Sequence, residues 1–217
     1  ITSMHVDSPE LHKVARISKD IVKDSVVIVG GPYPTSGYKQ VMEDPNIDFC
    51  VVGEGEIPFA ELMKALRHGL DYENIRDVAF RINGEMVYNG SRDLISDLDS
   101  IPIPAWDLID MNDYFYGKKR SLENPVQVHK RAVSIISSRG CPYGCTYCHN
   151  IFGKKFRARS PENVIKELKH LVDRYDIQEI EFLDDTFNYD KERACGICDL
   201  IIEEKLKLGI CFSNGLR

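Results

Sequence analysis

The first third of the chain alternates short apolar runs with longer segments whose apolar residues recur every three or four positions. Residues 26–29 and 47–52 are largely apolar, as is usual for strands of a parallel sheet. The spacing of the other apolar residues predicts helices over residues 8–24, 37–43 and 58–67. Strands that alternate with helices in this way predict a doubly wound, Rossmann-like α/β domain.

The same alternation returns in the last third of the chain. Strands are predicted at residues 132–137, 179–183 and 210–213. Ser160 and Asp190 are suited to cap the two intervening helices, and we expect Gly209 to end the second of them. Repeated strand–loop–helix units predict a (β/α) barrel, of which a complete example takes about 250 residues. This part of the chain therefore predicts only the first units of a barrel.

The middle of the chain has a different pattern. Asn83 and Gly84 separate two short strand-like runs, which predicts a β-hairpin with a type I′ turn. Residues 98–108 carry two prolines and read as a semi-rigid linker in which Trp106 packs between domains. We therefore expect three regions. They are residues 1–70, residues 71–130 with the hairpin and linker, and residues 131–217.

The two ends suggest that the chain is part of a longer protein. It begins at Ile1 without an initiator methionine, and it stops at Arg217 shortly after an apolar run. We expect a fragment cut at both ends.

Composition narrows the classes of partner. The chain of 217 residues has a net charge of −6 at pH 7 and an isoelectric point near 5.6, so we expect no nucleic-acid partner. No apolar run approaches the ~20 residues that span a bilayer, so we expect no membrane partner. Seven cysteines, several of them clustered, fit metal ligation in a reducing compartment better than a disulfide framework. We expect a cytoplasmic protein.

The clustered cysteines are the strongest candidate for chemistry. Cys141, Cys145 and Cys148 share one short loop that follows a predicted strand. An iron–sulfur cluster of four irons normally takes about four cysteines. Three local cysteines would leave one iron open, and an open position marks a site that binds a reactant.

Other interpretations of this loop stay open. Cys145, Cys148 and His149 also match a haem-attachment pattern, which leaves Cys141 unexplained. A zinc site could add His149 to the cysteines, although His149 directly follows Cys148. The thiols could also be unrelated buried residues, but a loop with Pro142 and Gly144 is a poor place to bury them.

The remaining cysteines are assigned to packing. Cys195 and Cys198 form a CxxC pair inside a predicted amphipathic helix, whereas a redox CxxC stands at the start of a helix. We expect both to lie in the core, together with Cys50 and Cys211.

The segment from Gly140 to Cys148 resembles the cluster loop of the radical S-adenosylmethionine (radical SAM) superfamily, CxxxCxxC with an aromatic residue before the last cysteine. The resemblance implies a [4Fe–4S] cluster on Cys141, Cys145 and Cys148, with SAM on the open iron. It also implies that Tyr147 packs near the adenine, that Asp184 and Asp185 meet the methionine ammonium, and that Arg217 meets the carboxylate. The acid pair could instead cap the following helix.

A second resemblance covers the start of the chain. Residues 30–35 and 48–56 are similar to the second half of the cobalamin (B12)-binding domain that is fused to many radical SAM enzymes. A glycine pair after a strand could also be a plain tight turn. No histidine matches a cobalt-ligating motif, so we assign no cobalt ligand. The resemblance implies cobalamin contacts at Ser3, Gly30, Gly31, Thr35, Gly53, Glu54 and Gly55.

Together these resemblances imply an enzyme that reductively cleaves SAM to give a 5′-deoxyadenosyl radical. Methyl transfer to an unactivated carbon is the first expectation, with a small-molecule substrate and an electron donor such as flavodoxin or ferredoxin. A ring-forming or rearranging enzyme of the anaerobic Mg-protoporphyrin ester cyclase type is the alternative. From a different class, a non-catalytic zinc-binding interaction module remains open. Lys154, Lys155, Arg157 and Arg159 form a basic run that reads either as a solvated loop or as a contact for an anionic substrate.

Overall fold

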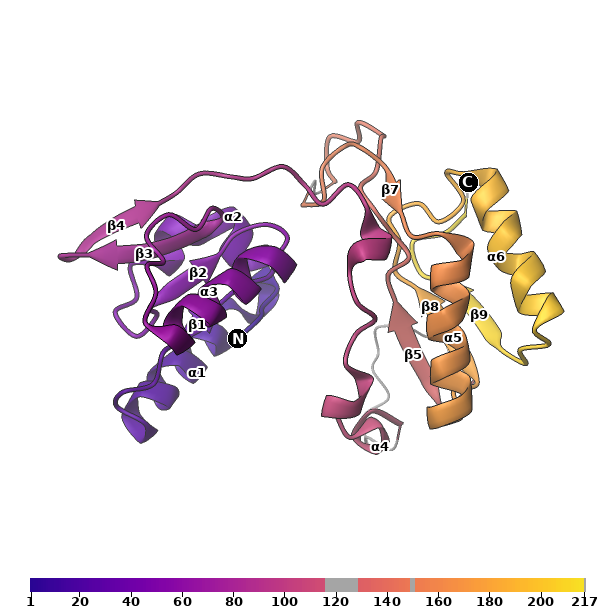
Figure 1. Cartoon of the computed structure of the whole chain (residues 1–217), viewed down its shortest axis with the longest axis horizontal. Helices are drawn as coiled ribbons and strands as arrows, with labels where there is room; N and C mark the ends of the chain where they lie inside the picture. Colours follow the sequence, from indigo (N-terminus) through magenta and orange to yellow (C-terminus); the bar gives the residue numbers. More distant parts are fainter. Residues whose placement is uncertain (116–128, 149–150, 217) are drawn as a thin grey trace. The chain divides into compact units, whose positions relative to one another are not determined.

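A computed structural model describes residues 1–115, 129–148 and 151–216 of the chain. The chain forms two compact units, Ile1–Ile95 and Ser96–Arg217, which are each described by themselves (Figure 1). Within the described part of the chain, no helix has the length and apolar character needed to cross a membrane.

The first unit is built on one mixed sheet. Its strands are β1 (Ile28–Val29), β2 (Phe49–Val51), β3 (Val78–Ile82) and β4 (Glu85–Tyr88), hydrogen-bonded in that order. β1 and β2 are parallel, and a parallel bridge between Thr2 and Gly30 adds the start of the chain beside β1. β3 and β4 are antiparallel to their neighbours. The turn between them has φ 52° at Asn83 and φ 85° at Gly84, as a type I′ turn requires.

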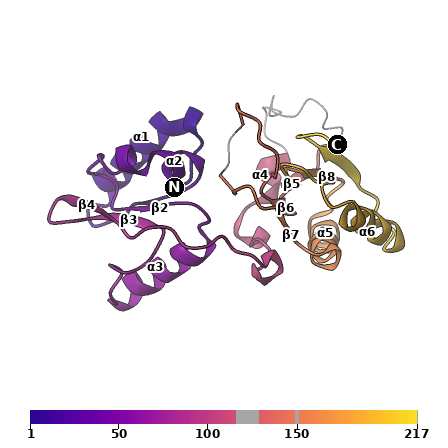
Figure 2. The same ribbon diagram turned by 90° about the horizontal axis from the view of Figure 1, so that it is seen from above.

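Helices cover both faces of this sheet, as Figure 2 shows. They are α1 (Ser8–Ile21), α2 (Pro32–Val41) and α3 (Glu56–His68), preceded by a 3₁₀ turn η1 (His5–Asp7). Leu11 of α1 and Val41 of α2 share one buried cluster with Val29 and Cys50, whereas Leu62 of α3 packs with Phe49 on the other side. The first unit is therefore a three-layer α/β sandwich, in keeping with the predicted Rossmann-like class.

The second unit contains a parallel sheet of three strands in the order β5, β8, β9. Its elements are η2 (Leu98–Ser100), η3 (Trp106–Leu108), α4 (Met111–Phe115), β5 (Ala132–Ile135), β6 (Ser138–Arg139), β7 (Arg157–Ala158), α5 (Pro161–Tyr175), β8 (Glu179–Phe182), α6 (Lys191–Glu203) and β9 (Gly209–Phe212). α5 and α6 lie side by side on one face, where Leu168 and Ile197 pack with Ile180 and Phe182 of β8. These strand–helix repeats are the first units of a (β/α) fold, as predicted.

The starts of α5 and α6 follow the sequence signals. The Ser160 side chain accepts a hydrogen bond of 3.1 Å from the Asn163 N–H, and Asp190 accepts one of 3.0 Å from the Arg193 N–H. The prediction that Gly209 ends α6 is wrong. The helix stops at Glu203, Lys205 takes the left-handed conformation with φ 53°, and Gly209 is already the first residue of β9.

The middle region is divided between the two units. β3 and β4 extend the sheet of the first unit, so residues up to Ile95 group with it, whereas residues from Ser96 group with the second unit. Trp106 packs against the core of the second unit, and its indole N–H donates to Glu167 Oε1 at 3.0 Å. α2 also begins earlier than predicted, at Pro32, and is kinked at Gly37.

Candidate functional site

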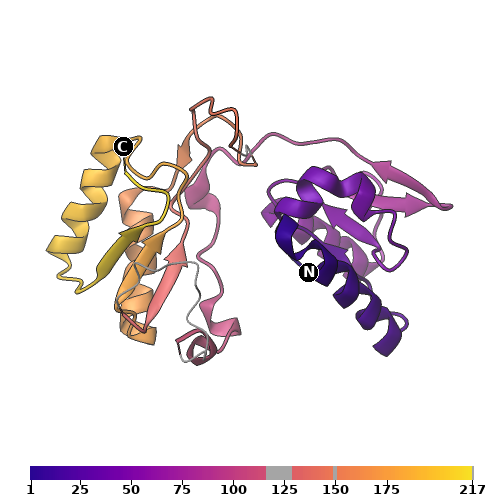
Figure 3. The same cartoon turned by 180° about the vertical axis from the view of Figure 1, so that it is seen from behind.

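The cysteine loop leaves the sheet at the carboxyl end of β5, where it rises from the sheet in Figures 1 and 3. A two-stranded antiparallel pair closes its base, with Ser138 opposite Ala158 and Arg139 opposite Arg157. This strand pair was not predicted from the sequence, where Arg157 was interpreted as part of a basic run. The pair brings both ends of the intervening segment to one place, so the loop projects from a fixed base.

Gly140 occupies a position that only glycine fits. Its φ is +84°, and a Cβ there would lie 2.3 Å from the Lys155 carbonyl oxygen. Main-chain atoms cannot turn aside as a flexible side chain can. The residue directly before Cys141 is therefore held against the returning strand by close backbone contact.

The thiols themselves differ in their surroundings. Cys141 is half-buried, Cys145 and Cys148 are exposed, and all three are free thiols. Among the residues that the structure describes, no three metal-binding side chains converge on one point. His149, the extra ligand of the zinc interpretation, lies outside the described residues. The residues fit an iron–sulfur cluster by donor chemistry, because three free thiols share one anchored loop.

Asp184 follows β8 and lies directly beside the entrance of this loop. Its carboxylate accepts hydrogen bonds from the Ser137 N–H and hydroxyl, both at 2.6 Å, and from the Ser138 hydroxyl at 2.7 Å. Asp184 is only 2% exposed. It does not cap a helix, because Asp190 performs that role for α6. Its oxygens are directed at the protein rather than at an open ligand position.

Arg193 completes a buried polar network under the loop. One guanidinium nitrogen donates to both the carbonyl and the hydroxyl oxygen of Ser137 at 2.8 Å, and Nε donates to the Arg159 carbonyl at 2.7 Å. Burial lowers the pKa of Arg193, while the charges of Asp184 and Asp190 oppose this shift. Arg193 and Ser137 were not singled out in the sequence. The two serines that precede Arg139 and the Gly-Cys pair were the available signal.

The basic run after the cysteines is largely structural. Arg157 is buried and donates to the Phe152 carbonyl at 2.9 Å. Arg159 forms an ion pair with Glu167, which is itself buried. Lys154 donates to the Tyr143 carbonyl at 2.6 Å. Arg157 and Arg159 therefore brace the loop and the start of α5, whereas Lys154 and Lys155 are exposed, as the solvated-loop interpretation has them.

The other predicted SAM contacts lie around the same edge. Asp185 is half-exposed, and Tyr147 is 91% exposed on the cysteine loop. Thr186 was not predicted, yet its hydroxyl oxygen lies 3.6 Å from the sulfur of Cys141. Arg217 is outside the described residues. The carboxyl ends of β5 and β8 thus bring Cys141, Asp184, Asp185 and Thr186 together.

In the first unit, the predicted cobalamin contacts gather at the carboxyl ends of the parallel strands. The Ser3 N–H donates to the Gly30 carbonyl, and the Ser3 carbonyl accepts from the Tyr33 N–H at 3.1 Å. The Thr35 hydroxyl accepts from the Gly53 N–H at 3.0 Å. A Cβ on Gly31, where φ is +97°, would lie 2.5 Å from the Thr2 hydroxyl. These contacts join the two strand-end loops into one edge.

Two members of this predicted set have structural partners. Glu54 is buried, and its carboxylate accepts a hydrogen bond of 2.8 Å from the Ile95 N–H. Gly55 is the residue before the first turn of α3. Glu54 therefore fixes Ile95, the last residue of the first unit. The rest of the predicted set at the strand ends consists mainly of glycine backbone.

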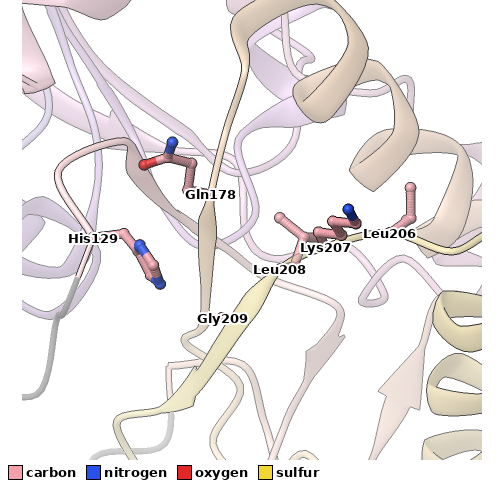
Figure 4. Close-up of a pocket in the computed structure, with 6 residues that line it drawn as sticks. All are labelled: His129, Gln178, Leu206, Lys207, Leu208 and Gly209. Carbon is pink, nitrogen blue, oxygen red and sulfur yellow. The ribbon is translucent and has the colours of Figure 1, made fainter.

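Figure 4 shows a hollow at the other end of the second unit's sheet. It is open, has a volume of about 560 Å³, and is lined by His129, Gln178, Leu206, Lys207, Leu208 and Gly209. Gln178 and Gly209 stand at the amino ends of β8 and β9. The hollow is therefore at the opposite strand ends from the cysteine loop.

The prediction for the remaining cysteines is half wrong. Cys195 and Cys198 are exposed on α6, because the neighbouring Ile197 and Ile201 form its buried stripe. Burial raises the pKa of Cys198, and the nearby charges of Cys195 and Asp199 add to this shift. Cys50 and Cys211 do lie in the core, and burial raises the pKa of Cys50 to about 12.

Family comparisons match each unit separately. Residues 135–216 match the model of the radical SAM superfamily, and residues 1–63 match the model of the B12 binding domain. Among curated proteins, the chain is 39% identical over 202 residues to an uncharacterized methyltransferase of Pyrococcus horikoshii, covering 92% of this chain and 42% of that protein.

Two further relatives have named activities. Cytidylyl-2-hydroxyethylphosphonate methyltransferase of Streptomyces wedmorensis is 28% identical over 85% of this chain and 38% of its own length. The anaerobic magnesium-protoporphyrin IX monomethyl ester cyclase of a Synechocystis strain is 29% identical over 98% of this chain and 40% of its own length. The chain spans about two fifths of the length of these relatives.

Solved structures share the fold. The cobalamin-dependent SAM radical enzyme OxsB, with aqua-cobalamin and SAM bound, superposes with a TM-score of 0.77 at 19% identity, over 96% of this chain and 29% of that one. The radical SAM methyltransferase TsrM from Kitasatospora setae, with cobalamin and a [4Fe–4S] cluster bound, gives a TM-score of 0.64 at 21% identity, over 90% and 37%. With both domain models matched in order, the chain belongs to the radical SAM superfamily and carries a B12-binding domain ahead of its radical SAM domain.

Proposed function

We propose that the chain is part of a cobalamin-dependent radical SAM enzyme that transfers a methyl group to an unactivated carbon of a small molecule. The observation that carries this proposal is the CxxxCxxC loop at the carboxyl end of β5, in a chain that also matches a B12 binding domain. Five relatives that match the chain are named as methyltransferases or methylases.

In this proposal, Cys141, Cys145 and Cys148 hold a [4Fe–4S] cluster. When bound, the cluster supplies the electron that cleaves SAM to a 5′-deoxyadenosyl radical. The protein positions the reactants and excludes water. The anchored base formed by β6, β7 and Gly140 holds the loop during this chemistry.

Around the loop, Asp185 is the better candidate of the acid pair for the methionine ammonium of SAM. It is half-exposed, whereas the carboxylate of Asp184 already accepts three hydrogen bonds. A carboxylate beside an ammonium group makes a charge-assisted hydrogen bond. Tyr147 remains the candidate for contact with the adenine, since it is exposed on the loop.

Cobalamin would lie along the edge formed by Ser3, Gly30, Gly31, Thr35 and Gly53. Glycines there let a ligand approach the main chain closely. Glu54 and Gly55 would act indirectly, by holding the neighbouring loop and the start of α3. We assign no cobalt ligand among the residues of this chain.

A second candidate is ring formation of the anaerobic cyclase type. It is favoured by the matched cyclases of Synechocystis and Rubrivivax gelatinosus, which cover 98% and 97% of this chain. Both candidates place the enzyme in the cytoplasm, with flavodoxin or ferredoxin as the electron donor. They share the cluster and SAM, so the first test applies to both.

The test is anaerobic reconstitution with iron and sulfide. We expect a brown protein with about four irons per chain. On reduction it should cleave SAM to 5′-deoxyadenosine. Cys145→Ala should lose both the cluster and cleavage, while Cys198→Ala should keep both because that thiol is exposed on α6.

The opposite outcomes are equally clear. A colourless protein that holds one zinc ion would support the interaction module and refute the enzyme. Equal iron content in the two alanine variants would refute the assignment of the cysteine loop. Methylated product and cyclised product, separated by mass spectrometry with candidate substrates, would decide between the two enzyme types.

A further inference from the structure

Thr186 lies where the segment after β8 meets the entrance of the cysteine loop. Its hydroxyl oxygen is 3.6 Å from the sulfur of Cys141. Thr186 is only 8% exposed and Cys141 is half-buried, whereas Cys145 and Cys148 are exposed. Of the three loop thiols, Cys141 is thus the least exposed to solvent.

Several hydrogen bonds fix these two segments against each other. Asp184, two residues before Thr186, binds Ser137 and Ser138 at 2.6 to 2.7 Å. The Leu183 N–H donates to the Ile135 carbonyl at 2.9 Å, in continuation of the β5–β8 pairing. Gly140 lies against the Lys155 carbonyl group, where an added Cβ would come within 2.3 Å of the oxygen. The β5–β8 pairing and the hydrogen bonds of Asp184 therefore position Thr186 beside Cys141.

The hydroxyl group has one proton to donate. With Cys141 as a thiol, the S–H can donate to the Thr186 oxygen, while the Thr186 hydroxyl donates to the Asp185 carbonyl at 2.7 Å. A cysteine that ligates iron is a thiolate, which can only accept. The Thr186 hydroxyl must then turn from the Asp185 carbonyl to the sulfur, a rotation about one bond.

We propose that Thr186 donates a hydrogen bond to the sulfur of ligated Cys141 and thereby raises the reduction potential of the cluster. The inference rests on the proposed function, because it requires the cluster. Hydrogen bonds to cluster sulfurs stabilise the reduced form, which carries more negative charge. Thr186 acts through Cys141, so it is a positioning residue rather than a catalytic one.

The test compares Thr186→Val with Thr186→Ser in the anaerobically reconstituted protein. Valine has the shape of threonine without the hydroxyl group, and serine keeps the hydroxyl group. The readout is the midpoint potential from a redox titration followed by electron paramagnetic resonance. We expect a shift to more negative potential in Thr186→Val and a potential close to the parent in Thr186→Ser.

Thr146→Val is the matched control, because Thr146 is an exposed threonine of the same loop. It should leave the potential unchanged. An unchanged potential in Thr186→Val, or an equal shift in Thr186→Ser or Thr146→Val, would overturn the inference. Thr186→Ala serves as a second variant without the hydroxyl group. If both variants that lack it fail to take up iron while Thr186→Ser succeeds, the residue is needed for assembly and the tuning role is refuted.

Failure of the proposed function has a separate signature. In that case the unaltered protein takes up no four-iron cluster, and no potential can be measured in any variant. A parent protein that holds the cluster but shows no effect of Thr186→Val refutes the inference alone.

Discussion

The candidate sites of the two units are built from different parts of the chain, main-chain atoms in one and buried polar side chains in the other. In Ile1–Ile95 the edge at the strand ends is made of backbone, with Gly30, Gly31 and Gly53 and a few hydroxyl groups. In Ser96–Arg217 the corresponding edge is held from below by Asp184 and Arg193, which are 2% and 8% exposed. A backbone edge is damaged where an added side chain has no room, as at Gly31, whereas a buried polar network is damaged by the loss of one partner.

The largest effect is expected where the buried network loses its carboxylate. Asp184→Ala leaves the Ser137 N–H and the hydroxyl groups of Ser137 and Ser138 without their acceptor, and it removes a negative charge near the buried Arg193. Removing one partner from such a buried set costs about 3–5 kcal/mol of unfolding free energy. Chemical denaturation should show this loss, and Asp185→Ala should cost far less because Asp185 is half-exposed. Equal losses of unfolding free energy in the two variants would mean that the buried network does not stabilise this end of the sheet.

Gly140→Ala is expected to cause the second largest loss of unfolding free energy. Its Cβ would meet the Lys155 carbonyl oxygen at 2.3 Å in a left-handed conformation. Overpacking together with an unfavourable φ costs about 2–4 kcal/mol, and iron uptake should fall. Gly144→Ala is the control in the same loop, because a Cβ there would have no neighbour within 4 Å. Full iron uptake by Gly140→Ala would contradict a fixed loop base.

Gly31→Ala tests the backbone edge of the first unit. The added Cβ would lie 2.5 Å from the Thr2 hydroxyl, which can rotate, and 3.1 Å from two main-chain atoms of Ser3. We expect a loss of about 1–3 kcal/mol in unfolding free energy. Cobalamin binding, followed by its absorbance after gel filtration, should weaken. Gly37→Ala, where the nearest atom is 3.7 Å away, should change neither.

The smallest effect concerns an ion pair away from both edges. Hydrogen bonds from Asn46 and His12, together with the charge of His12, lower the pKa of Asp44, although burial acts in the opposite direction. A carboxyl group with a lowered pKa in the folded state stabilises the protein above its unfolded pKa of about 3.9. That contribution is lost as the pH falls through the folded pKa. Asp44→Asn should therefore be less stable at pH 7, with a difference that shrinks below about pH 4.

Denaturation midpoints measured across this pH range provide the check. Asp24→Asn is the control, because Asp24 is exposed. A difference between Asp44→Asn and the parent that stays constant from pH 7 to pH 3 would show that the ion pair contributes nothing.

Sequence patterns were sufficient where local physics decides the structure. The Asn83–Gly84 turn, the caps at Ser160 and Asp190, and the place of the cysteine loop after β5 were all predicted. The β6–β7 pair was missed because two-residue strands that contain Arg139 and Arg157 leave no apolar period. Such pairing depends on how the tertiary structure brings residues 157–158 back beside residues 138–139.

The orientation of Asp184 could have been found in the sequence. Successive side chains of a strand point to opposite faces, so Asp184 shares a face with Ile180 and Phe182, which pack under α5 and α6. Its proximity to Ser137 requires the β5–β8 register, which no local pattern gives. For Cys195 and Cys198, the helical pattern was correct but the wrong stripe was assigned to the interior.

The base of the cysteine loop has a consequence for repair. It consists of main-chain pairs and a glycine contact, so none of its bonds involves a thiol. A cluster destroyed by oxygen would leave this base standing. The apoprotein could then be reconstituted with iron and sulfide without first unfolding.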